Sequence, residues 1–365
     1  MMRKESADVV VIGGGARGLS VAYYLSKAGV DVSVLEKRFI AAGASGLNTG
    51  YANISGKGPR FYTEFSKISA DMYPLLNEEL GEPIEYERNG SLMPIETEDE
   101  WQKEEKTVEE RNQVTGLNMR MLTIDEAREI EPGLSRHLLG GAFCPIDGSV
   151  NPLKLTRTLA RQAAQNGARI YTGQEVVDIR VAAGRIEEVI TTKTRISTHV
   201  VVNAAGIHVP RIAKMVGIEV PVYPERGQLT ISEAMPRVMR RPIGPYMQFE
   251  NGHVLIGFTN ENVGEDTHVT SGMISSRVQK AMRILPWLRN VHGIRCTAAL
   301  RPMPPDRLPI YQKMAGPGDF YVTVGHSGIT LTPITGKVFS DLITQGRTEI
   351  PLDEYRVERF CEKTR

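Results

Sequence analysis

Two short apolar runs, at residues 9–12 and 32–35, flank a glycine-rich turn and an amphipathic stretch near the start of the chain. Valine-rich runs of this length are typical of strands buried on both faces of a parallel sheet. Apolar residues that recur on one face predict a helix over residues 19–28, and Gly29 supplies its end. The pattern therefore predicts a βαβ unit.

The remaining pattern alternates helical and extended segments without an internal repeat. Charged amphipathic segments predict helices at 66–80, 98–114 and 124–130, with strands at 84–88 and 91–94 between them. A further αβ unit is predicted by a helix that Asn151-Pro152 starts and Asn166-Gly167 ends, followed by strands at 169–172 and 175–180. Short apolar pieces within 220–258 favour an antiparallel sheet. The strand, turn and helix order of the first unit is predicted again later in the chain, by strands at 200–203 and 320–324 and a helix at 336–345.

The glycine turn carries the first candidate chemistry. Gly13 suits a tight turn, Gly15 admits a pyrophosphate close to the backbone, and Gly18 allows the helix to pack on its strand. The helix N-terminus then directs free N–H groups at the phosphates. Glu36, at the end of the second strand, suits the ribose hydroxyls and repels a 2′-phosphate, which predicts FAD or NAD and not NADP. A glycine-rich turn without a ligand is the alternative.

Arg17 is unusual beside such a turn, and two interpretations stay open. Its guanidinium either contacts a phosphate or is simply solvated.

Composition narrows the class of protein. A chain of 365 residues exceeds what a single core usually serves, which predicts two compact parts. A formal net charge of +1 and the absence of a basic run argue against nucleic acid or an acidic membrane surface as the main partner.

Cys144, Cys296 and Cys361 are too scattered for a disulfide framework or an iron–sulfur cluster, so no metal is expected. The chain passes almost directly into its first strand, and no apolar run approaches transmembrane length. A cytoplasmic protein is expected, with peripheral membrane attachment through a partner left open.

Motifs spread over nearly the whole chain resemble the D-amino acid oxidase-like flavoenzymes, which include glycine oxidase, sarcosine oxidase and multi-subunit amine dehydrogenases. The motifs are the turn at 13–18 with Glu36, Gly-Ala-Ser-Gly-Leu-Asn-Thr-Gly at 43–50, Asn-Ala-Ala-Gly at 203–206, Arg-Pro-Met-Pro-Pro-Asp-Arg-Leu-Pro at 301–309 and Gly-His-Ser-Gly-Ile-Thr-Leu-Thr-Pro at 325–333. Pro-Glu-Arg-Gly-Gln at 224–228 looks most like the FAD-bearing subunit of proline or hydroxyproline dehydrogenase, opine oxidase and hydrogen cyanide synthase.

The resemblance implies an α/β fold with a Rossmann-like FAD-binding domain and a substrate domain, of α+β type, built on a discontinuous antiparallel sheet. The FAD-binding domain would comprise residues 1–80, 145–215 and 300–365, and the substrate domain 81–144 and 216–299. The cofactor would be noncovalent FAD, because Cys296 lies too early in the chain to match the covalent attachment of monomeric sarcosine oxidases.

The resemblance also implies which residues meet the cofactor. Segment 43–50 would run along the pyrophosphate and flavin, with Ser45 and Asn48 as donors, and segment 325–331 would direct amides at the pyrimidine edge of the flavin. The cofactor residues so expected are Gly13, Gly15, Ala16, Gly18, Glu36, Lys37, Ser45, Asn48, Thr49, Gly50, Val176, Ala205, Gly206, Arg301, Gly325, Ser327, Gly328, Ile329, Thr330 and Leu331. A flexible loop or plain sheet packing is the alternative for these segments.

Three residues are the candidates for substrate chemistry. Arg301 would hold a carboxylate by two parallel hydrogen bonds, with a surface salt bridge as the alternative. Tyr246 would present a hydroxyl over the flavin, with a core strand position as the alternative. His326 would tune the flavin or touch the substrate, or be structural.

The expected reaction is oxidation of the C–N bond of a small amino or imino acid by hydride transfer to flavin N5, which gives an imine. A dehydrogenase that passes electrons to a partner subunit is favoured. The alternatives are an oxygen-using oxidase of the glycine or sarcosine oxidase type, a NAD-dependent dehydrogenase and a noncatalytic FAD-holding subunit.

Overall fold

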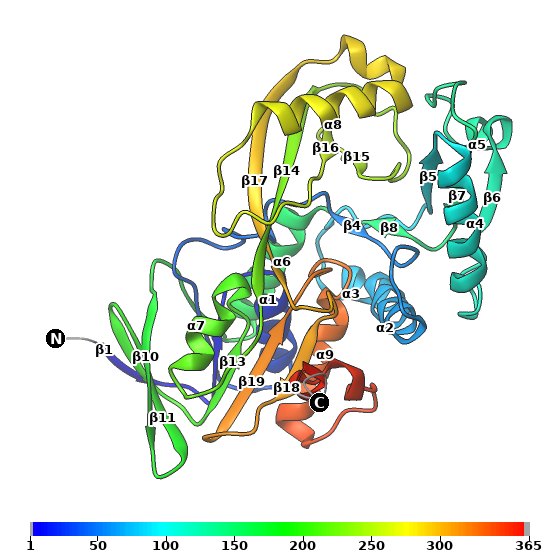
Figure 1. Ribbon diagram of the computed structural model, residues 1–365. Helices are drawn as coiled ribbons and strands as arrows, with labels where there is room; N and C mark the ends of the chain where they lie inside the picture. The colour runs from blue at the N-terminus through cyan, green and yellow to red at the C-terminus, as the bar shows by residue number, and fades with distance from the viewer. Residues whose placement is uncertain (1–2, 361–365) are drawn as a thin grey trace.

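The computed structural model describes residues 3–360, and a six-stranded sheet with the order β18-β19-β13-β2-β3-β9 forms its centre (Figure 1). All neighbouring strands in it are parallel except β18, which pairs antiparallel with β19. Its strands are β2 (Val9–Ile12), β3 (Val32–Leu35), β9 (Arg169–Tyr171), β13 (Val200–Asn203), β18 (Ile310–Lys313) and β19 (Asp319–Val324). The predicted βαβ unit is confirmed.

Alternate side chains of this sheet enter two different cores. Val9 and Val11 pack beneath a layer of helices, whereas Val10 and Ile12 pack on the opposite face. A strand with both faces buried must be apolar at every position, which explains the continuous apolar run. The helices of the first layer are α1 (Ala16–Lys27), α6 (Pro152–Gln165) and α9 (Thr332–Gln345).

A second sheet, with the order β1-β12-β11-β10, and α7 (Val209–Lys214) contribute to the core on the opposite face. Figure 1 shows this sheet at the lower left, near the N-terminus. Its strands are β1 (Arg3–Ser6), β10 (Val176–Ala182), β11 (Arg185–Thr191) and β12 (Thr194–Ser197).

Two antiparallel sheets extend away from this layered part, and the short apolar pieces at 220–258 predicted one of them. One has the order β15-β16-β14-β17, and its outer face is covered by α8 (Ser271–Ile284); the other has the order β5-β7-β6. Two bridges, from Leu92 to Ile243 and from Ile243 to Tyr246, connect them. The strands are β14 (Tyr223–Ala234), β15 (Tyr246–Gln248), β16 (His253–Gly257), β17 (Gly293–Met303), β5 (Ser91–Ile95), β6 (Arg120–Thr123) and β7 (Gly140–Cys144).

The remaining elements connect these parts. A two-stranded ribbon joins β4 (Tyr51–Ala52) to β8 (Gly148–Ser149). The other helices are α2 (Arg60–Asp71), α3 (Tyr73–Glu79), α4 (Glu98–Arg111) and α5 (Ile124–Ile130), and short helical turns are η1 (Gly206–His208), η2 (Pro286–Asn290), η3 (Asp353–Tyr355) and η4 (Val357–Phe360).

Three predicted elements differ from the structure. The helix expected at 66–80 is two helices that separate at Met72, because Pro74 sits in the first turn of α3. The strand expected at 84–88 is irregular: Glu85 has a φ of 53°, and only Glu87 pairs with another segment, at Ser149. The last helix begins at Thr332, four residues earlier than predicted.

No helix within residues 3–360 is both long and apolar enough to cross a membrane.

Candidate active site

The turn between β2 and α1 leaves no room for side chains. Gly13 has a φ of 119°, and a Cβ there would lie 2.4 Å from the carbonyl oxygen of Ala204. A Cβ on Gly18 would lie 2.1 Å from the carbonyl oxygen of Gly13, so glycine permits the close packing of the helix that the sequence predicted. The turn and the small residues after β13 therefore meet backbone to backbone.

Side chains from later in the chain hold this turn. Glu36 accepts a hydrogen bond from the amide of Gly14 through Oε2 (2.9 Å) and from the amide of Arg38 through Oε1 (2.8 Å). The Ser45 hydroxyl accepts from the amide of Ala16 (3.0 Å). A carboxylate has about four lone-pair positions, so Glu36 keeps acceptor capacity on the side that lines the cavity.

A cavity of about 1090 Å³ runs from Glu36 and Val176 past the glycine turn to Arg301 and the segment 325–330. That volume lies slightly above the roughly 300–1,000 Å³ of ordinary ligand pockets, as a dinucleotide together with a substrate requires. The predicted cofactor residues that line it are Gly13, Gly15, Glu36, Lys37, Ser45, Asn48, Thr49, Val176, Ala205, Gly206, Arg301, Gly325, Ser327, Gly328, Ile329 and Thr330.

Four predicted cofactor residues do not line the cavity. Ala16 and Gly18 belong to the first turn of α1 and position its backbone. A Cβ on Gly50 would lie 2.3 Å from the carbonyl oxygen of Val150, so Gly50 serves backbone packing. Leu331 is fully buried in the core beneath the helices. These four residues therefore pack against other parts of the protein and do not line the cavity.

Asn48 lines the cavity, but its polar groups are used within its own loop. Nδ2 donates to the carbonyl oxygens of Ala44 (2.9 Å) and Ser45 (2.8 Å), and Oδ1 accepts from the amide of Gly50 (2.7 Å). Asn48 therefore stabilises the shape of its loop, and it does not have the donor role toward a ligand that was expected.

Arg17 is buried, so the solvated alternative is wrong. Its Nη1 donates to the hydroxyls of Tyr311 (2.6 Å) and Thr323 (3.1 Å), and its Nη2 donates to the carbonyl oxygen of His326 (2.9 Å). Its Nε is buried without a hydrogen-bond partner among the described residues, on a side chain that lines the cavity. Arg17 thus ties α1 to the 325–331 segment.

Long-range hydrogen bonds hold the segment before α9 in place. The Tyr73 hydroxyl donates to the carbonyl oxygen of Ile329 (2.5 Å), and the Ser69 hydroxyl donates to that of Thr330 (2.8 Å). Gly325, with a φ of 137°, leaves no space for a side chain, because its Cβ would lie 2.7 Å from Pro309 Cα. A preorganised loop of this kind can present amides to a ligand without a large ordering cost.

His326 lines the cavity as a neutral ring. Burial, reinforced by the positive charges of Lys57 and Arg301, holds the pKa of its imidazole well below the ordinary value. The Tyr62 hydroxyl donates to the Ser327 hydroxyl (2.9 Å), which leaves the Ser327 proton for His326 Nδ1 (2.9 Å). This assignment of hydrogens makes Nε2–H the free donor of the ring.

Arg301 projects from β17 into the cavity with a side chain only 14% exposed. Its Nη1 donates to the carbonyl oxygen of Thr259 (2.9 Å), to Asn260 Oδ1 (3.1 Å) and to Glu225 Oε1 (3.2 Å). A Cβ on Gly227 would lie 2.2 Å from Nη2, so the guanidinium lies flat over that glycine. Nε and Nη2 have no acceptor among residues 3–360, which leaves one edge of the planar fork for a carboxylate.

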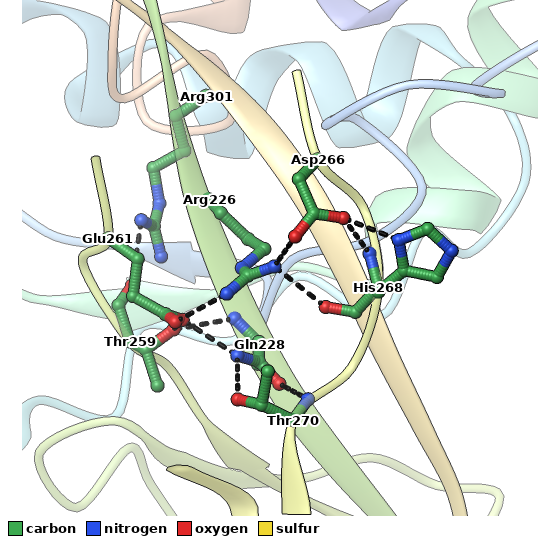
Figure 2. Close-up of polar contacts among 8 residues, drawn as sticks. All are labelled: Arg226, Gln228, Thr259, Glu261, Asp266, His268, Thr270 and Arg301. Carbon is green, nitrogen blue, oxygen red and sulfur yellow. Dashed lines mark hydrogen bonds and ion pairs between the residues drawn. The ribbon is translucent and has the colours of Figure 1, made fainter. Parts of the chain in front are cut away.

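A buried polar network fixes the segment that grips Arg301 (Figure 2). Arg226, on the opposite face of β14, forms ion pairs with Glu261 (2.8 Å) and Asp266. The amides of Arg226 and Glu261 each donate to the other residue's carbonyl oxygen. Gln228 binds the same segment through Glu261 Oε1 (2.8 Å) and the Thr270 hydroxyl (2.9 Å). Residues 259–261 are consequently an extension of the sheet beside Arg301.

Tyr246 does not reach the cavity, and its predicted position over the flavin is wrong. It lies opposite Ile256 in the antiparallel pairing of β15 with β16, and both residues belong to the core under α8. Directly paired residues point to the same face of a sheet. The core strand alternative is therefore the correct one, and burial raises the pKa of the Tyr246 hydroxyl to about 12.

Two functional candidates were missed. Asp147, fully buried, accepts six hydrogen bonds of 2.6–3.2 Å, including those from the amides of Ile54 and Ser55 and the hydroxyl of Ser91. Lys57, 7% exposed, lies on the loop so held and lines the cavity. The only signal in the sequence was the Gly-Lys-Gly tripeptide at 56–58, which does not reveal burial.

Cys296 pairs with Thr230 on the strand face opposite to Arg301 and does not line the cavity. It offers no thiol to a flavin, and Cys144 is buried in another core. Cys361 lies outside the described residues.

The residues present fit a flavin dinucleotide. A helix N-terminus, a carboxylate at the end of β3, a loop with constrained amides and an orphaned guanidinium nitrogen meet in one cavity. These features define a dinucleotide-dependent oxidoreductase with a separate anion-binding end.

Comparison with known proteins specifies the family. The model of the family described as FAD dependent oxidoreductase (DAO) matches residues 8–342, and the chain belongs to that family. The match assigns FAD in place of NAD, confirms the resemblance to the D-amino acid oxidase-like flavoenzymes and excludes the NAD-dependent alternative.

Relatives cover nearly the whole chain. Hydrogen cyanide synthase subunit HcnC of Pseudomonas protegens is 29% identical, over 97% of this chain and 96% of its own. The crystal structure of glycine oxidase from Geobacillus kaustophilus has a TM-score of 0.92 at 26% identity and covers 97% of this chain and 99% of its own. L-proline dehydrogenase from P. horikoshii has a TM-score of 0.90 at 26% identity, over 99% of both chains. The predicted fold class is confirmed.

Proposed function

We propose that this chain oxidises the C–N bond of a small amino or imino acid to an imine. The observation that carries the proposal is Arg301, whose guanidinium is buried at the end of the FAD cavity with one edge free. The names of the relatives support the same substrate class, since glycine and proline each present an amine next to a carboxylate.

In this proposal the protein contributes orientation and electrostatics. Glu225 accepts from Arg301 and also from Arg307, so the three side chains together keep one positive charge for an incoming carboxylate. Neutral His326 directs Nε2–H into the cavity as a donor. FAD, when bound, supplies the acceptor for the hydride that leaves the substrate α-carbon.

We propose further that the enzyme is a dehydrogenase with an electron-accepting partner subunit, because one relative is a named subunit and another a dehydrogenase. Oxygen as the acceptor is the second candidate, favoured by the similarity to glycine oxidase. A noncatalytic FAD-holding role is the third. A cytoplasmic location, noncovalent FAD and the division into an FAD-binding domain (1–80, 145–215, 300–365) and a substrate domain (81–144, 216–299) remain part of the proposal.

The test is the visible spectrum of the purified protein under nitrogen, before and after addition of a panel of amino and imino acids. Bleaching of the flavin bands by one compound is expected, and slow return of colour in air would identify a dehydrogenase. Rapid return would identify an oxidase. Flavin that no compound in the panel reduces would overturn the proposal.

A further inference from the structure

Lys57 is a buried cation without a counter-charge in contact. Its side chain lines the cavity, and Nζ has no hydrogen-bond or ion-pair partner among residues 3–360. Loss of solvation lowers the pKa of this ammonium to about 8, although the charge of Asp147 opposes the shift. A lone buried ammonium of this kind is costly in a folded protein, and a bound anion would remove the cost.

The backbone around Lys57 is rigid, which makes its position a built feature. The Lys57 amide donates to the carbonyl oxygen of Ile54 (2.9 Å), and the Thr63 hydroxyl donates to the Lys57 carbonyl oxygen (2.6 Å). Asp147 holds the start of the same loop through the amides of Ile54 and Ser55. The backbone of Lys57 is therefore held at both its N–H and its carbonyl oxygen.

Asp147 is the acid whose charge acts on Lys57, and its acceptor capacity is spent. Its two oxygens already receive six hydrogen bonds from amide and hydroxyl donors. Two carboxylate oxygens offer about four lone-pair positions, so no free position remains for an ammonium. The positive charge of Lys57 is thus available to a ligand.

Lys57 and Arg301 line the same cavity from different elements. Arg301 comes from β17, and Lys57 comes from the loop between β4 and α2. Both charges act on His326, which lines the cavity together with them. A ligand beside His326 therefore lies in the field of both cations, whereas a single carboxylate needs only the free edge of Arg301.

We propose that Lys57 forms a second anion subsite, so that the substrate is an amino or imino acid with two carboxylates, one bound by Arg301 and the other by Lys57. This inference rests on the proposed function and names its substrate class.

The test compares two unreactive ligands that differ by one carboxylate. In thiodiacetate and (methylthio)acetate, sulfur replaces the amine, so each binds without oxidation. Binding to the FAD-loaded protein is followed through the flavin absorbance. The wild-type protein is expected to bind thiodiacetate 10- to 100-fold more tightly, on the order of a charge-assisted hydrogen bond.

Variants assign that preference to one side chain. Lys57→Met, which keeps length and removes charge, is expected to abolish the preference without weakening (methylthio)acetate. Lys57→Arg is expected to retain most of it. Lys214→Met removes one exposed charge outside the cavity and is expected to leave the preference unchanged, which controls for net charge.

Each result decides between the inference and the proposed function. Equal affinity of the wild-type protein for the two ligands would overturn the Lys57 subsite and leave the carboxylate site of Arg301 intact. An equal loss of affinity for both ligands in Lys57→Met would also overturn the subsite, because Lys57 would then bind the carboxylate that both ligands share, or the flavin. Failure of both ligands to bind the wild-type protein would refute the Arg301 site and with it the proposed function.

Discussion

Replacement of Lys57 by methionine should make the ligand-free protein more stable at neutral pH. Burial lowers the pKa of Lys57 from 10.5 to about 8. Each tenfold change in an acid dissociation constant corresponds to about 1.36 kcal/mol, so the charged side chain destabilises the folded state by up to about 3 kcal/mol. Methionine has a similar length and no charge, so the variant avoids this cost.

The effect has a definite pH dependence. Below pH 8 the lysine is charged in both the folded and the unfolded protein, and the full difference between wild type and variant is expected. Between about pH 8 and 10.5 the folded protein releases the proton while the unfolded chain keeps it, so the stability of the wild type rises toward that of Lys57→Met. At higher pH the difference should vanish.

The assay is urea unfolding followed by circular dichroism at pH 7 and at pH 10.5, without anionic ligands. Lys57→Arg is the matched control, because its charge persists at both pH values and its destabilisation should not change. The argument is refuted if Lys57→Met is less stable than wild type at pH 7, or if the difference is the same at the two pH values.

Four further substitutions test the site. Arg301→Lys keeps the charge but loses the planar fork, so kcat/KM should fall on the order of 100-fold in steady-state assays while bound flavin is retained. Unchanged kinetics would show that Arg301 does not bind the substrate. Glu36→Gln should weaken FAD about tenfold in a fluorescence titration, and an unaltered Kd would contradict the ribose assignment. Tyr246→Phe should change kcat and KM less than about twofold, since a larger drop would mean that the hydroxyl reaches the substrate. Asp147→Asn should cost about 3–5 kcal/mol in thermal unfolding, and an unchanged Tm would show that the loop does not depend on this charge.

Local sequence patterns predicted the cofactor half well. The strands at Val9–Ile12 and Val32–Leu35 and the helix between them follow from a continuous apolar run, one amphipathic face and a glycine stop. Gly18 could be interpreted correctly because its role concerns a neighbouring turn. The helix expected at 66–80 was predicted less well, since amphipathic periodicity continues through Met72 although Pro74 starts a new helix.

The functional side chains depended on distant parts of the chain. Arg301 was found through its motif, but the acceptors that leave one edge of its guanidinium free come from Glu225, Thr259 and Asn260. Asp147 could not be recognised, because its donors come from two segments far from it in the chain, residues 51–55 and Ser91. A residue's type in the sequence does not tell which strand face or which partner it will meet.

The sequence by itself determined the βαβ unit and the dinucleotide turn, because these depend on steric limits and hydrophobic periodicity within short stretches. The flavoenzyme family followed from the resemblance of motifs spread along the chain. Only the tertiary structure decided that Tyr246 faces the core, that Arg17 is buried and that Lys57 has no counter-charge in contact among residues 3–360. Strand register and burial are set by packing between segments far apart in the chain. A shift of one residue in register moves each side chain to the opposite face of the sheet.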